Sequence, residues 1–172
     1  MVTDSAIQRT PAGNALTALV LDLFKVNGLL LTTGDRLGAP LRMTSARWRM
    51  LGAIDRAVHP QPVAWLARNL GANRQNVQRI INDLNKEGLV AFAPNPHHRR
   101  AQLVVLTDKG RQTLDATRRL QVPWINSVAS GLQVEEIETA HRVLVVLRRR
   151  LEANGEAESE SQSPVERQLA TS

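Results

Sequence analysis

The feature that most constrains the fold is a change of periodicity within residues 62–110. The first part, PVAWLARNLGANRQNVQRIINDLNKEG, has the spacing of two helices with Gly71 between them, and the following LVAFAPNPHHRRAQLVVL alternates as strands do. Two helices joined by a turn of three to four residues that contains Gly form a helix-turn-helix. A β-hairpin directly after such a pair predicts a winged helix-turn-helix.

The ends of both helices carry recognisable signals. The first helix is predicted over residues 62–70, because Pro62 suits a first turn in which its missing N–H would be unpaired anyway. Gly71 can take a positive φ at the C-terminal end of that helix. Asn73 can then cap the second helix, predicted over residues 73–86, by accepting a hydrogen bond from one of its exposed N–H groups.

The second helix separates into an apolar face and a polar face, the apolar one consisting of Val77, Ile80, Ile81 and Leu84. A solvated surface helix is the alternative interpretation, but this polar face carries Gln, Asn and Arg rather than Glu–Lys pairs. Arg can bind guanine through two hydrogen bonds, and Gln or Asn can bind adenine in the same way. We therefore predict that this helix enters the major groove and that the DNA-binding residues are Asn73, Arg74, Gln75, Asn76, Gln78, Arg79 and Asn82.

The hairpin is predicted to have strands over residues 89–92 and 101–106, with a basic loop between them. Arg99 and Arg100 in this loop repel each other unless an anion is near. A DNA phosphate, or a narrow minor groove with its enhanced negative potential, would supply one. A solvated turn is the alternative, but the adjacent helix favours DNA binding by both Arg99 and Arg100.

Three segments together, RWRML, LARNLGANRQNVQRIINDLNKEGLV and HHRRAQLVVLTDKG, resemble the signature of the MarR family of bacterial transcription regulators. The likeness extends from about residue 15 to residue 151. The family's wing usually carries Asp-Arg-Arg, and this chain has His98 in place of the Asp that is expected to orient a wing Arg. The resemblance implies a homodimer that binds a pseudo-palindromic operator in double-stranded DNA and is commonly released by a small ligand, which suggests a repressor.

The flanking segments predict additional helices and a fold that is mainly α with a small β-hairpin wing. Residues 15–31 are apolar around much of a helix, residues 32–40 have the composition of a loop, and Pro123 should kink or interrupt a long helix that begins near residue 107. The predicted division is an N-terminal dimerisation helix at 1–38, the DNA-binding winged helix-turn-helix at 41–109, C-terminal dimerisation helices at 110–152 and a disordered acidic tail at 153–172.

Charge and composition narrow the functional class. The net charge is +6, but the segment after Leu151 has five Glu and one Arg, so it carries −4 and leaves +10 on the body. A basic body favours a polyanionic partner. Cysteine is absent, which excludes thiol chemistry, and four His without suitable spacing give little support for a metal site. We predict no enzymatic activity, no cofactor and no membrane association, and a cytoplasmic location.

The resemblance also implies an effector site between the dimer helices and the winged module. Mapped onto this chain, the aromatic rings of Phe24 and Trp48 could stack a small aromatic effector, and Lys25 or Arg49 could pair with an anionic one. Core packing of the two rings and solvation of the two cations are the simpler interpretations. Two other functions also remain open at this stage, a winged-helix module for protein–protein interaction and a ligand-independent DNA-binding protein.

Overall fold

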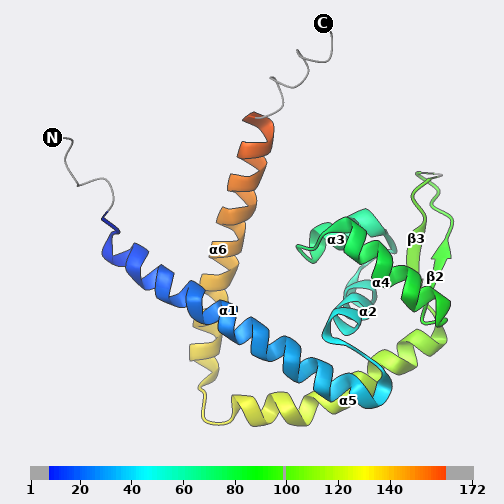
Figure 1. Ribbon diagram of the computed structural model, residues 1–172, viewed down its shortest axis with the longest axis horizontal. Coiled ribbons are helices and arrows are strands. Elements are labelled where there is room, and N and C mark those ends of the chain that lie inside the picture. Colours follow the sequence, from blue (N-terminus) through cyan, green and yellow to red (C-terminus); the bar gives the residue numbers. More distant parts are fainter. Residues whose placement is uncertain (1–7, 99, 162–172) are drawn as a thin grey trace, which may run out of the picture. The chain divides into compact units, whose positions relative to one another are not determined.

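The computed structural model describes residues 8–98 and 100–161, which fall into two units divided after Ile125. Helices dominate and a small antiparallel sheet accompanies them, as the sequence predicts (Figure 1). In chain order the elements are α1 (Pro11–Gly38), the 3-10 turn η2 (Ala39–Leu41), α2 (Ser45–Arg56), β1 (Gln61–Pro62), α3 (Val63–Asn69), α4 (Arg74–Lys86), β2 (Val90–Ala93), β3 (Leu103–Leu106), α5 (Asp108–Ala129) and α6 (Val134–Ser161).

Helices α3 and α4 form the predicted helix-turn-helix. Gly71 lies between them with φ of +57°, the left-handed conformation that favours glycine. Asn73 caps α4, since its Oδ1 accepts hydrogen bonds from the backbone N–H groups of Gln75 at 2.8 Å and Asn76 at 3.3 Å. These two local devices fix where α3 ends and where α4 begins.

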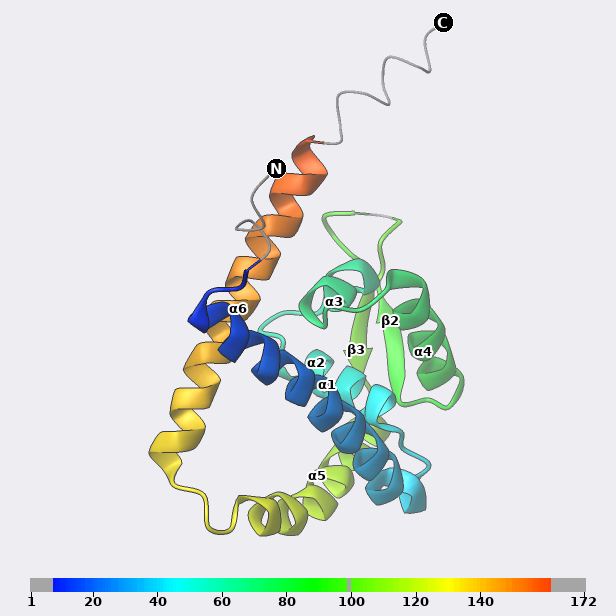
Figure 2. The same cartoon turned by 60° about the vertical axis from the view of Figure 1, so that its left-hand side comes forward.

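The sheet has the strand order β1-β3-β2, with both pairs antiparallel. Val90 pairs with Leu106 at the base of the β2–β3 hairpin, which extends beside α4 as the wing (Figure 2). The hairpin matches the prediction, although both strands begin one or two residues later than expected. The short β1 was not predicted, because two residues are too few to show an alternating pattern.

The core lies where α2, α3, α4, α5 and the wing meet. Its fully buried side chains include Leu51, Leu66, Ile81, Leu84, Val104 and Leu114. Each such side chain contributes about 1.5–3 kcal/mol when it leaves water. Because α4 packs its apolar face into this core, its polar face is held outward in a fixed orientation.

Helix α1 is longer than predicted, and the expected loop at 32–40 is wrong over residues 32–38. The helix continues because its last turns pack closely on the start of α2: Asp35 Oδ1 accepts a hydrogen bond from the Ser45 N–H at 2.6 Å, and the Ser45 hydroxyl donates to the Leu31 carbonyl at 2.8 Å. Gly34 and Gly38 leave room for this approach. Residues 32–38 have the composition of a loop because the helix needs small residues where it contacts the start of α2.

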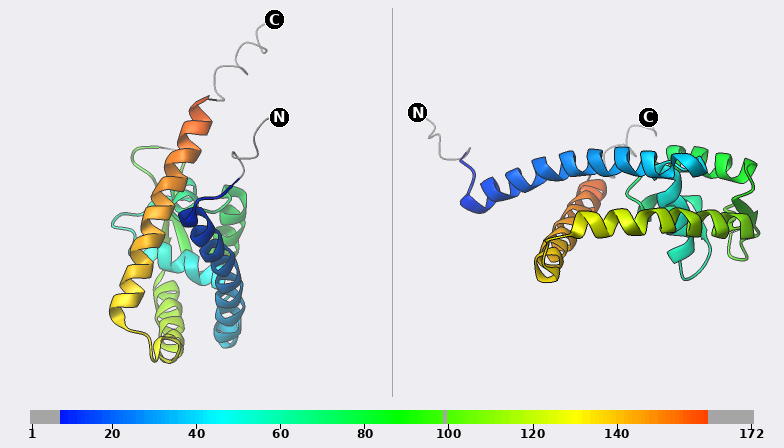
Figure 3. Two further views of the ribbon diagram at one scale, coloured as in Figure 1. Left: turned by 90° about the vertical axis from the view of Figure 1, so that its left-hand side faces the viewer. Right: turned by 90° about the horizontal axis from the view of Figure 1, so that it is seen from below.

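The N-terminal part of α1 extends well beyond the winged module (Figure 3). Leu16, Leu19, Leu21, Phe24 and Leu29 are among its exposed apolar residues. By length and composition the stretch 11–41 would suffice to cross a bilayer, the single such stretch among the described residues. This is a weak indication, since helices of soluble proteins that pack against other helices meet the same criterion.

The second unit contains the end of α5 and all of α6. Pro123, which lies in the first unit, is predicted to kink or interrupt this helix; α5 continues through it as one helix, so no interruption occurs. Gly131, with φ of +84°, lies in the turn that separates α5 from α6. α6 reaches Ser161, so residues 153–161 are helical rather than part of a disordered tail. Their Ala and Glu residues are good helix formers that can extend the helix; the remainder of the predicted tail, 162–172, lies outside the described residues.

Candidate nucleic-acid interface

The outward face of α4 presents the predicted base-reading residues. All are exposed except Gln78, which is half-buried; the exposed ones are Asn73, Arg74, Gln75, Asn76, Arg79 and Asn82. Arg79 donates from its guanidinium to Asn76 Oδ1, and Gln78 donates from its amide to Asn82 Oδ1, each at 3.0 Å. These bonds align the side chains along the helix and leave most guanidinium donors of Arg79 available.

The wing loop is organised by a residue that sequence reasoning missed. Asn95 donates from its side-chain amide to the Ala101 carbonyl at 2.8 Å, and its Oδ1 accepts from the His97 N–H at 3.0 Å. An Asn between two prolines is a signal that could have revealed this turn. Arg100 is exposed on the loop that Asn95 closes, whereas Arg99 lies outside the described residues.

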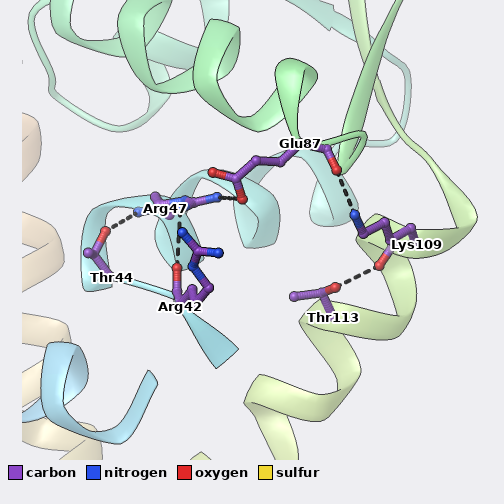
Figure 4. A network of polar contacts seen from close by, with 6 residues as sticks. All are labelled: Arg42, Thr44, Arg47, Glu87, Lys109 and Thr113. Carbon is purple, nitrogen blue, oxygen red and sulfur yellow. Dashed lines mark hydrogen bonds and ion pairs between the residues drawn. The ribbon is translucent and has the colours of Figure 1, made fainter. Parts of the chain in front are cut away.

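A second missed group holds the C-terminal end of α4 from two sides (Figure 4). Glu87, the C-cap residue of α4, accepts a hydrogen bond on its carboxylate from Arg47 Nη2 of α2 at 2.5 Å. Its backbone carbonyl accepts another from Lys109 Nζ of α5 at 2.8 Å. Arg47 also donates from Nη1 to the Arg42 carbonyl at 3.1 Å, and the Thr44 hydroxyl accepts a hydrogen bond from the Arg47 N–H at 3.3 Å. No sequence pattern links residues this far apart.

A cavity of about 370 Å³ lies between α1, α2 and the part of α5 that ends at Trp124. Trp48 and Arg49, two of the predicted effector residues, line it, together with the unpredicted Arg56, Arg118 and Trp124. Phe24 and Lys25 do not line it. The Phe24 ring is 72% exposed, and Lys25 pairs at 3.7 Å with Asp22 on the surface of α1. The cavity therefore offers two indoles and three guanidinium groups from elements of one unit.

One of those cations is held by two carboxylates. Arg118 donates to Asp55 Oδ2 at 2.6 Å, and Asp115 accepts from its other terminal nitrogen at 3.2 Å. The hydrogen bond to Asp55 raises the pKa of Arg118 above its ordinary value, and the Asp115 contact acts in the same direction. Arg118 is therefore a permanent cation, partly neutralised by Asp55, while Arg49 has no ion pair among the described residues.

Comparison with known proteins agrees with this architecture. A profile of the MarR family matches residues 43–101, the winged module. An uncharacterized protein of Mycobacterium tuberculosis (strain ATCC 25618 / H37Rv) is 36% identical over 138 residues, which cover 77% of this chain and 94% of that protein. The transcriptional activatory protein BadR of Rhodopseudomonas palustris is 28% identical over 133 residues, which cover 75% of this chain and 76% of BadR.

Solved structures show the same fold. The transcriptional repressor CouR bound to a 23-mer DNA duplex superposes with a TM-score of 0.68 at 22% identity, covering 82% of this chain and 99% of that one. CouR from Rhodococcus jostii RHA1 bound to p-coumaroyl-CoA gives a TM-score of 0.67 at 17% identity, covering 73% and 88%. With the winged module, the family profile and a relative of this identity in agreement, the chain belongs to the MarR family of transcription regulators.

Proposed function

We propose that the protein is a homodimeric, sequence-specific repressor that binds a pseudo-palindromic operator in double-stranded DNA and is released by a small aromatic or anionic effector. The observation that carries this proposal is the outward face of α4, where Arg, Gln and Asn side chains are exposed on a helix whose opposite face is buried. Such a face suits hydrogen bonding to base edges in the major groove. An exposed apolar patch, which protein–protein contact would need, is lacking among the described residues of this face.

In this proposal the contacts divide by role. Gln75, Asn76 and Arg79 read base edges, because they lie on the first two turns of α4, the part that enters the groove. Arg100, with Arg99 beside it in sequence, contacts phosphates or the minor groove and contributes affinity for any sequence. The remaining predicted DNA-binding residues are proposed to make additional contacts to the DNA beside these two groups. They are Asn73, Arg74, Gln78 and Asn82.

The dimer is supported by apolar surface that a single chain leaves in water. In α1 the exposed residues include Leu16, Leu19 and Leu30, and in α6 they include Ile137 and Val143. A soluble monomer rarely leaves this much apolar helix uncovered. Burial against a second copy would remove it from solvent and would place two α4 helices in the symmetric arrangement that a palindrome requires. A cytoplasmic location is part of the same proposal.

The effector component is supported by the cavity that Trp48, Arg49 and Trp124 line. Two indoles can stack a planar ring, and the guanidinium of Arg49 can pair with its carboxylate or phosphate. A volume of about 370 Å³ lies at the small end of the range for ligand pockets. It suits a single-ring compound better than a large conjugate.

The test starts with selection of preferred duplexes from a random library by the full-length protein. The expected result is a sequence with two inverted half-sites, their centres about one helical turn apart. A thermal-shift screen of aromatic carboxylates and phenolics, repeated as competition against the selected duplex, then tests release. Recovery of no preferred sequence would overturn the proposal, and recovery of a sequence that no compound releases would favour ligand-independent binding.

The direction of control needs a separate measurement, because BadR is named as an activator. Transcription from a promoter that contains the selected operator would be measured in vitro with and without the protein. A repressor lowers transcript yield when the operator overlaps the promoter. A rise in yield would make the chain an activator and leave the DNA-binding part of the proposal unchanged.

A further inference from the structure

The contact between Arg47 and Glu87 joins two parts of the winged module that have different roles. Glu87 ends α4, and Arg47 lies in the first turn of α2 (Figure 4). The two side chains also line one groove of about 450 Å³, and the same groove is lined by Asn76 and Arg79 of the base-reading face. A displacement of Glu87 would therefore move the C-terminal end of the same rigid helix that carries Arg79.

Arg47 is held more firmly than a surface cation. Its side chain is 19% exposed, and its Nε is buried without a hydrogen-bond partner among the described residues. The two terminal nitrogens bind the Glu87 carboxylate and the Arg42 carbonyl. Arg42 has a φ of +52°, so this carbonyl belongs to a left-handed turn whose geometry the bond helps to fix. Exposed ion pairs are often too mobile to fix an element. In this one the Glu87 side chain is 47% exposed, but the Arg47 side chain is largely removed from solvent and is anchored at two points.

Arg47 is also adjacent to the cavity. Ser45, Trp48 and Arg49 of the same helix line the cavity, and Ser45 is bonded to α1 through Asp35. A ligand that displaces the N-terminal turns of α2 would therefore move Arg47 with them, since the turns of a helix move together. The bond to Glu87 would transfer that movement to α4.

We propose that Arg47 is a positioning residue for DNA reading, which fixes the C-terminal end of α4 against α2 and links the cavity wall to the base-reading face. This inference depends on the proposed function of α4 as a DNA-reading helix. Arg47 contacts no base in this mechanism. Its role is to hold α4 at the angle at which Gln75 and Arg79 meet the operator.

The test compares Arg47→Met, Glu87→Gln and the double variant with the wild type. Affinities for the duplex selected by the wild type and for a random duplex of equal length are measured by fluorescence anisotropy at several salt concentrations. Each single variant should lower the ratio of specific to non-specific affinity by at least about fivefold, the lower end of a typical coupling between sites. The double variant should lose no more than the larger single loss, because both changes break the same bond.

The two simpler roles of Arg47 give different results. If Arg47 contacts a phosphate, Arg47→Met lowers both affinities equally and reduces the salt dependence. If Glu87 acts only by repelling DNA, Glu87→Gln raises both affinities. Either outcome, an unchanged affinity ratio, or additive losses in the double variant would overturn the proposal. A wild-type protein with no sequence preference would instead overturn the proposed function.

A further variant, Arg47→Lys, distinguishes loss of the two hydrogen bonds from misfolding of the protein. It keeps the positive charge but cannot bind the carboxylate and the carbonyl with a planar fork, so it should lower the specificity ratio while non-specific affinity stays unchanged. The matched controls are Arg148→Met and Glu152→Gln, which make the same chemical changes in an exposed ion pair of α6 at 3.8 Å. Both controls should retain the wild-type ratio, and sedimentation and thermal unfolding of every variant establish that the compared proteins are folded and in the same assembly.

Discussion

Arg79 and Asn76 are joined across one turn of α4 by a hydrogen bond of 3.0 Å from the guanidinium to the amide oxygen. Three residues of helix bring the two side chains onto neighbouring positions of the same face. The bond limits the rotamers that Arg79 can adopt before DNA arrives. An ordered arginine loses less side-chain entropy on binding, so Asn76 can contribute to recognition even if it contacts no base itself.

The first prediction concerns sequence discrimination by α4. Arg79→Ala and Gln75→Ala should each reduce the preference for the selected operator over a random duplex by about 1–3 kcal/mol, the usual value of a good base contact. Non-specific affinity should change less for Gln75→Ala than for Arg79→Ala, since Gln75 carries no charge. Competition titrations with both duplexes measure the effect. Loss of discrimination in wing variants alone would contradict this assignment.

The second prediction concerns the wing. Arg100→Ala should weaken binding to operator and random duplex alike and lower the slope of log affinity against log salt by about one, because one phosphate contact is lost. Arg99→Ala is predicted to act in the same way. Arg149→Ala in α6 serves as the control for loss of an arginine elsewhere. An effect of Arg100→Ala on the operator alone would indicate base or groove-shape readout instead.

The third prediction uses two glycines of α1 that differ in their surroundings. A Cβ added at Gly38 would collide with the Met43 carbonyl, which is backbone and cannot rotate away, whereas Gly28 has no neighbour within 4 Å of that position. Gly38→Ala should therefore lower the free energy of unfolding by about 1–3 kcal/mol. Gly28→Ala should raise it by about 0.5–1 kcal/mol, because alanine loses less backbone entropy in a helix. Denaturant unfolding at one fixed protein concentration compares them, and equal shifts for both variants would contradict the close contact.

The fourth prediction concerns assembly. Leu19→Glu in α1 should convert the proposed dimer into a monomer at micromolar concentration, because a charge cannot be buried in an apolar contact without a partner. Operator affinity should fall with it, since two linked half-sites bind more tightly than one. Asn14→Glu, which replaces an exposed polar side chain in the first turn of the same helix, should leave the dimer intact. Sedimentation velocity separates the outcomes, and a dimer that survives Leu19→Glu would place the contact elsewhere.

Local signals in the sequence are sufficient to predict the helices and turn of the winged module. The apolar face of α4, the cap at Asn73 and the left-handed Gly71 all act within a few residues of where they stand, and each occurs as predicted. The end of α1 was misjudged for a physical reason. Gly34, Asp35 and Gly38 resemble a loop by composition, yet they are helical because Ser45, ten residues after Asp35, bonds to that carboxylate.

The candidate site divides in the same way. The polar face of α4 could be predicted because one helix positions all of it, and Trp48 and Arg49 line a cavity, although their role as effector residues stays a prediction. Phe24 and Lys25 were not, since the direction of α1 relative to α2 depends on tertiary contacts. Arg47 and Glu87 are forty residues apart. The sequence contains many other cations and carboxylates that could pair over a long separation. Only the folded structure selects this pair from the others.

The attachment of α1 to α2 through Ser45 has a mechanical consequence. A helix of 28 residues is about 42 Å long at 1.5 Å per residue, and its C-terminal end is joined to the winged module by two hydrogen bonds and a short turn. A rotation of α1 can therefore be transmitted to the winged module. In the proposed dimer, a rotation of α1 by about 5° about its N-terminal end would shift the winged module at its C-terminal end by about 3–4 Å. This shift is close to the 3.4 Å between successive base pairs along one strand. Operators whose half-sites are one base pair closer together or farther apart would then favour different orientations of α1.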